Sequence, residues 1–218
     1  MAKKNNIPSF FSLSDQKAAA DKRTKLYRIC NGIKPDKMKE KRPVTEAQAK
    51  QQLRFATATA FTKKLTQLTS IGFKSMTKTM TATNVSTRQV LKDAIIGEYP
   101  DYSIDYAKVI ISSGTHSELM KCAVELRPEG SVVATWKNSL IQNALGFHDD
   151  PVFLCVYNAT RKICHNYVGA ACRADQLLHA PLPDFLECDI YHSWIFVASP
   201  NLRNVSPSLY FNLCTLNV

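Results

Sequence analysis

Apolar residues recur with helical spacing between Val44 and Phe73, and no Pro or Gly interrupts them before Gly72. Thr45 and Gln48 fit a capping box, in which each side chain accepts a hydrogen bond from the backbone N–H of the other residue. The pattern predicts a helix over residues 45 to about 70, roughly 39 Å long at 1.5 Å per residue. Phe55 falls opposite an apolar stripe that also contains Lys64, so we expect two contact surfaces. The stripe consists of Leu53, Ala56, Ala60, Phe61, Leu65, Leu68 and Ile71.

A second, shorter apolar face follows a segment rich in Thr and Lys. Ser86 and Gln89 offer a second capping box, and Gly97 is suited to the position just after a helix. Pro100 forbids continuation. We expect a helix over about residues 84–96 that forms a hairpin with the first.

The pattern changes to short runs of Val, Ile, Tyr, Phe and Trp beyond Pro100. Such runs, bounded by turn residues, predict strands. Seven of them without an intervening helical pattern indicate an immunoglobulin or fibronectin type III-like Greek-key sandwich, with Trp136 as a core anchor. The predicted strands are 106–113, 118–126, 131–136, 152–157, 163–168, 188–198 and 208–213.

These patterns predict an α+β protein in three parts. Residues 1–44 form an extended basic arm, 45–98 the helical hairpin and 99–218 the β-sandwich domain. In the run 188–198, Tyr191, Ile195 and Val197 share one face. The opposite face carries Cys188, Ile190, His192, Trp194 and Phe196.

Charge is unevenly distributed over these parts. Residues 1–50 hold 13 Lys/Arg against 5 Asp/Glu, residues 51–98 hold 7 against 2, and residues 99–218 hold 8 against 11. The arm contains one basic run, Lys34, Lys37, Lys39, Lys41 and Arg42, and one apolar cluster, Ile7, Phe10, Phe11 and Leu13. The basic run is open to three interpretations: phosphate binding, docking on an acidic protein surface, or a solvated linker.

Several segments resemble a known family. They are T-E-A-Q from Thr45, the motif G-E-Y-P-D-Y-S-I-D-Y over residues 97–106, and shorter matches around Trp136, Tyr157, Arg173 and Tyr210. The chain is similar over about residues 43–211 to an uncharacterised bacterial or phage-associated family known mainly as a domain of unknown function. That family begins with a Gly-rich stretch, whereas Gly32 is the only glycine in the first 44 residues here. The resemblance implies a hairpin followed by a β-domain and transfers no activity.

Candidate chemistry is sparse. The sequence lacks GxSxG, HExxH and GxxxxGK[ST]. Asp101 and Asp105 suit turns and caps, and the His148-Asp149-Asp150 run suits a solvated turn, although either could be a site. Zinc sites use closely spaced ligands, whereas the Cys and His residues here are irregularly spaced, so we expect no metal and no cofactor. They are Cys164, His165, Cys172, His179, Cys188 and His192.

The sequence therefore favours a non-enzymatic structural or assembly protein. We expect it to dock on other subunits of an oligomeric particle, such as a phage virion, through the arm and through Phe55 on the long helix. The alternative is a nucleic-acid-associated protein that binds the phosphate backbone through its basic half. With an odd number of cysteines, seven, and no apolar stretch long enough for a membrane span, we expect a cytoplasmic or virion location.

Overall fold

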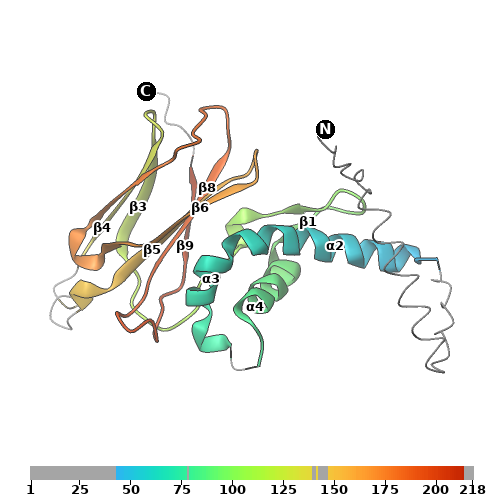
Figure 1. Ribbon diagram of the computed structural model, residues 1–218, viewed down its shortest axis with the longest axis horizontal. Helices are drawn as coiled ribbons and strands as arrows, with labels where there is room; N and C mark the ends of the chain where they lie inside the picture. Colours follow the sequence, from blue (N-terminus) through green and yellow to red (C-terminus); the bar gives the residue numbers. More distant parts are fainter. Residues whose placement is uncertain (1–42, 78, 139–140, 142–146, 214–218) are drawn as a thin grey trace, which may run out of the picture. The chain divides into compact units, whose positions relative to one another are not determined.

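The computed structural model describes residues 43–77, 79–138, 141 and 147–213. The chain divides into two compact units, residues 1–44 and 45–218, and the fold described here is that of the second unit. It consists of a helical hairpin followed by a β-sandwich, as the sequence predicts (Figure 1). None of the helices in the described ranges is both long enough and apolar enough to cross a membrane.

The long helix begins where the sequence predicts. The Thr45 hydroxyl accepts from the Gln48 N–H, and the Gln48 side chain accepts from the Thr45 N–H, so the capping box is present. The helix is interrupted by a 3₁₀ turn, which divides it into α2 (Glu46–Thr62), a 3₁₀ segment (Lys63–Leu65) and α3 (Thr66–Gly72).

The second helix differs from the prediction at both ends. It begins at α4 (Ala82–Gln89), where the Thr81 hydroxyl rather than Ser86 accepts the capping hydrogen bond. It continues as a π-helix over Val90–Ala94. The next two residues leave the helix as β1 (Ile95–Ile96), which pairs with β2 (Ser103–Ile104). Gly97, with φ +87°, therefore lies in the β1–β2 turn instead of closing a helix.

The sandwich has two antiparallel sheets, one of three strands in the order β3-β4-β7 and one of four in the order β6-β5-β8-β9. In chain order, the first, second and fifth strands make one sheet and the other four make the second, a fibronectin type III-like arrangement. The strands are β3 (Met120–Arg127), β4 (Ser131–Lys137), β5 (Pro151–Asn158), β6 (Ile163–Cys172), β7 (Leu177–Pro181), β8 (Tyr191–Val197) and β9 (Leu209–Leu213).

The two-residue strands β1 and β2 were not predicted. Within the sandwich, one predicted strand is wrong and one observed strand was missed. Residues 106–113 start as a 3₁₀ turn and then run as an irregular buried segment. Their backbone groups bond elsewhere, since the Ile111 N–H donates to the Ser208 hydroxyl and the Ser113 N–H to the Gly72 carbonyl. The missed strand, β7, pairs with β4 and completes the three-stranded sheet.

The two central strands of the four-stranded sheet, β5 and β8, are buried on both faces. One face meets the three-stranded sheet in the sandwich core, where Trp136 is 3% exposed as predicted. The other face meets the helices in the sheet–helix core. Strands β5 and β8 supply both, because successive residues of a strand point to opposite faces. To the sandwich core they give Val152, Leu154, Val156, Tyr191, Ile195 and Val197. To the sheet–helix core they give Phe153, Cys155, Tyr157, Trp194 and Phe196.

Candidate docking surface on the helical hairpin

The N-terminal part of α2 contributes no fully buried residue. The helix meets the sheet only from Ala58 onward, through Phe61 and then through Leu65 and Leu68. Phe55 lies outside this contact and is 53% exposed. A single exposed Phe is ordinary on a protein surface, and Phe55 is a docking candidate because it lines a groove together with the apolar side chains of Met80 and Leu91.

A groove next to Phe55 runs between α2 and the second helix. Two residues of its second wall, Arg88 and Lys92, follow one another at helical spacing along α4 and the π-helix. We call this groove the docking groove, and it is lined by Phe55, Met80, Asn84, Thr87, Arg88, Leu91 and Lys92.

Two polar contacts hold the walls of the docking groove together. The hydroxyls of Thr62 and Thr87 lie 2.8 Å apart in the buried interface between α2 and α4. The Arg54 guanidinium donates to the Leu91 carbonyl at 3.3 Å and lies over the Tyr102 ring, 6.0 Å from its centroid. The groove is therefore part of the packed hairpin.

The rim of the docking groove is cationic. Arg88 and Lys92 are both exposed. Among the described residues, the only carboxylate in ion-pair range of either is that of Asp93, 4.0 Å from the Lys92 ammonium. An exposed pair at this distance contributes little, so both cations are free to meet a partner.

The other predicted docking residues lie outside the described residues. These are the apolar cluster Ile7, Phe10, Phe11 and Leu13 and the basic run Lys34, Lys37, Lys39, Lys41 and Arg42. Phe55 is thus the predicted docking residue that the structure places.

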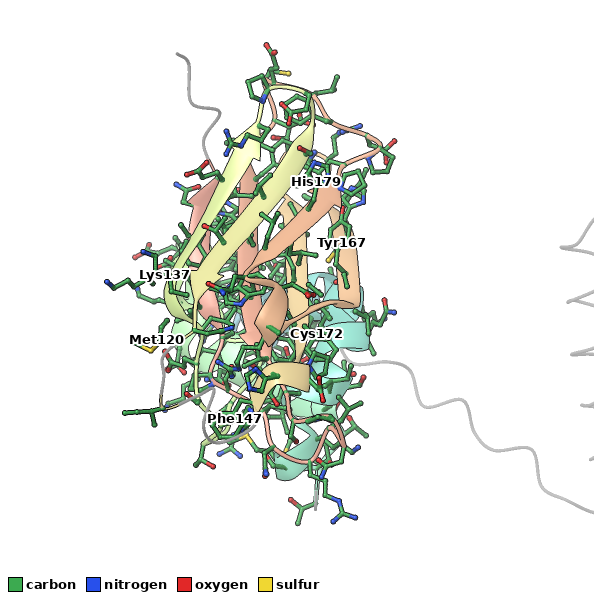
Figure 2. The ribbon with its side chains drawn as sticks, turned by 90° about the vertical axis from the view of Figure 1, so that its left-hand side faces the viewer. Met120, Lys137, Phe147, Tyr167, Cys172 and His179 are labelled. Carbon is green, nitrogen blue, oxygen red and sulfur yellow. The ribbon has the colours of Figure 1, made fainter. Side chains whose placement is uncertain are left out.

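The Cys and His residues considered for zinc do not converge. Cys164 packs on the sheet–helix core. His179 lies on β7 of the other sheet, and Cys172 ends β6 (Figure 2). His192 stacks on Tyr106 with ring centroids 4.2 Å apart, and burial lowers its pKa, which favours the neutral imidazole. In the part of the chain that the structure describes, no three His, Cys, Asp or Glu residues are grouped to hold a metal ion.

One carboxylate from each acidic run singled out in the sequence, that of Asp105 and that of Asp150, has structural partners. The Asp105 carboxylate caps a 3₁₀ turn by accepting from the Ala107 N–H and pairs with the Lys108 ammonium at 3.0 Å. Asp150 is not in a solvated turn, since it is only 1% exposed.

Asp150 belongs to a buried polar network that the sequence did not reveal. Its Oδ2 lies 2.7 Å from His116 Nε2 and accepts from Arg173 Nε at 3.1 Å. The remaining guanidinium nitrogens of Arg173 donate to the carbonyls of Ser117 and Glu118, at 2.7 and 3.0 Å. The network joins segments far apart in the chain, which no local pattern could have indicated. It ties the loop before β3 to the residue that precedes β5 and to the residue that follows β6.

The chain matches a family model and is similar to a solved structure. Residues 28–212 match the model of a family described as Family of unknown function (DUF6266), which contains the region of the resemblance noted above. None of the curated proteins compared with the sequence matches it. The solution structure of the fn3 domain of human contactin 1 is similar at 8% identity and a TM-score of 0.30, over 56% of this chain and 95% of that one.

Proposed function

Starting from the fact that this chain belongs to the DUF6266 family of unknown function, we propose that it is a non-enzymatic subunit of a multi-subunit assembly. It docks on neighbours through the basic arm and through the helical hairpin. The observation that carries the proposal is Phe55, exposed beside a preformed groove on a helix whose other face is used by the core. The particle that we propose is a phage virion or another multi-subunit assembly, with the chain in the virion or in the cytoplasm, by analogy with arm, helix and sandwich components of such particles.

Docking in trans also accounts for the arm. Its apolar residues Ile7, Phe10, Phe11 and Leu13 are too few to offset the backbone entropy of ordering, roughly 1–2 kcal/mol per residue. We call this apolar cluster the plug, and we propose that it enters a groove on a neighbouring molecule while the basic run links it to the hairpin. Exposed charge pairs contribute little each, so the plug supplies most of the affinity and the lysines mainly steer the encounter.

The test is the mass of the full chain in solution, measured by sedimentation velocity over a range of concentrations. We expect oligomers that dissociate when residues 1–14 are deleted. Replacing Lys37, Lys39 and Lys41 by Gln is expected to slow assembly without abolishing it. A monomer at every concentration, unchanged by the deletion, would contradict docking between copies of this chain.

Nucleic-acid binding is the second candidate, favoured by the cationic hairpin. Its described residues 43–77 and 79–98 hold seven Lys/Arg, among them Arg88 and Lys92, against three Asp/Glu. Binding to phosphates predicts a steep loss of DNA affinity between about 50 and 200 mM salt, because counterions are released. If the Gln variant of the arm loses DNA binding and the deletion of 1–14 leaves assembly intact, this candidate replaces the first.

A further inference from the structure

We propose that the docking groove binds an acidic amphipathic segment of a partner protein. The segment places aliphatic side chains on Phe55 and Leu91 and its carboxylates against Arg88 and Lys92. The inference rests on the proposed function, because it names the chemistry of the partner for the same surface.

The floor of the groove selects an apolar side chain. Phe55 is exposed, Met80 and Leu91 are half-buried, and Thr87 closes the base of the groove. Such a strip between two helices suits anchors that recur along one face of an amphipathic segment.

The second wall of the groove is shaped by an irregular turn. The π-helix over Val90–Ala94 carries both Leu91 and Lys92. A π-helix inserts an extra residue into the helical repeat and is frequent at functional sites. Here its Leu91 carbonyl accepts from Arg54, so the turn is held in place before any partner arrives.

The positive charge of the groove wall favours a partner segment that carries carboxylates. Arg88 and Lys92 line the wall beside the apolar floor. Carboxylates of a bound segment would therefore pair with them next to apolar surface from which the segment excludes water. The arm of this chain is a poor occupant, since residues 1–44 hold twelve Lys/Arg against four Asp/Glu. A nucleic acid would use the cations but leave the aliphatic floor of Met80 and Leu91 without a matching surface. An acidic protein segment satisfies both halves of the groove.

The probes are two fluorescent helical peptides with the same leucine face, one with Glu and one with Lys at every polar position, and a single-stranded oligothymidine. Binding of each to the full chain is measured by fluorescence anisotropy. We expect the Glu peptide to bind, the Lys peptide not to bind, and the oligonucleotide not to displace the Glu peptide. Phe55→Ser should weaken the Glu peptide about tenfold or more, the effect of losing a central anchor.

Charge reversal gives the sharpest readout. In the Arg88→Glu/Lys92→Glu variant the preference should invert, so that the Lys peptide binds better than the Glu peptide. Matched controls are Lys63→Glu/Lys74→Glu, which changes two exposed cations outside the groove, and Met76→Ser, which removes a 47% exposed apolar side chain outside it. Both controls should keep the preference for the Glu peptide.

Four results overturn the inference. They are no saturable binding of the Glu peptide, equal binding of both peptides, equal effects of the groove and control variants, and displacement of the peptide by oligothymidine. Sedimentation of the same variants separates this failure from that of the proposed function. If the chain forms oligomers but does not bind the Glu peptide, only the acidic partner is refuted. If the chain binds the Glu peptide but is a monomer whose mass the arm deletion does not change, only docking between copies is refuted.

Discussion

Replacing Phe61 by Ala should destabilise the sandwich as well as the helix that carries it. Phe61 lies on α2, is 3% exposed, and packs edge-on against the Tyr157 ring of β5 at 5.1 Å. Its ring is also 6.3 Å from that of Trp194 on β8. Both strands continue into the sandwich core through their opposite faces, so the loss on one side is transmitted to the other.

The magnitude follows from complete burial. Truncating a buried Phe costs about 3–5 kcal/mol. With a urea m-value of about 2 kcal/mol per M, the unfolding midpoint should fall by roughly 1.5–2.5 M. Phe55→Ala on the exposed side of the same helix is the control and should change the free energy of unfolding by less than about 0.5 kcal/mol.

Two tryptophans make the assay specific to each layer. Trp136 lies in the sandwich core and Trp194 in the sheet–helix core. In a Trp194→Phe background, urea unfolding followed by fluorescence reports Trp136 alone, while far-UV circular dichroism follows the helices. We expect one transition for both signals, displaced together by Phe61→Ala. A Trp136 transition that stays in place while the helical signal is lost earlier would show that hairpin and sandwich fold separately.

Three further predictions concern buried groups. Trp136→Ala should cost about 3–5 kcal/mol of unfolding free energy, whereas a loss below about 1 kcal/mol would place it at the surface. Asp150→Ala should cost about 3–5 kcal/mol of unfolding free energy, because it leaves the Arg173 guanidinium buried without its carboxylate. The double variant Asp150→Ala/Arg173→Met should lose less stability than the sum of the two single losses, which thermal unfolding would test. Burial raises the pKa of the Cys155 thiol well above its ordinary value, so iodoacetamide at pH 8.5 should alkylate the exposed Cys188 before Cys155. Peptide mass spectrometry that shows Cys155 labelled as early as Cys188 would contradict this.

Local signals in the sequence predicted the capping box and most of the strands, because these features depend on residues close together in the chain. The capping box at Thr45 needs only two side chains three residues apart, and it is present. Six of the seven predicted strands are found, because β-branched and aromatic runs bounded by turns suffice to indicate them. The alternation predicted for 188–198 holds within β8, where Tyr191, Ile195 and Val197 face one core while Trp194 and Phe196 face the other. It is wrong for Cys188 and Ile190, which precede the strand and are exposed.

The errors arose where long-range contacts decide the structure. Val109 and Ile111 are apolar because they are buried in the sheet–helix core, and their segment bonds to Gly72 and Ser208 without joining a sheet. Strand β7 has no β-branched residue and ends in Pro181, so only its pairing with β4 makes it a strand.

The sequence predicted one residue of the candidate docking surface, Phe55, but not the groove beside it. Phe55 was singled out because it falls off the apolar stripe, which a helical wheel shows directly. The groove beside it depends on where the second helix begins, and Ser86 offered a false capping box three residues before Gln89. The π-helix that carries Leu91 and Lys92 has no sequence signature.

The doubly buried sheet raises the question of how β8 finds its alignment during folding. In a sheet with one wet face, a slip by one residue would expose its apolar side chains, and this penalty sets the register. In β8 both faces are buried and mainly apolar, with Ser193 on one and His192 on the other, so a slip would largely exchange one hydrophobic set for the other. The correct register must then be distinguished from the shifted one by the sizes of the side chains that each core accepts and by hydrogen bonds. The helix side takes Trp194 and Phe196, and there the Trp194 indole N–H donates to the Val109 carbonyl at 3.0 Å. A one-residue slip would aim that indole into the sandwich core, where its donor would lose this acceptor.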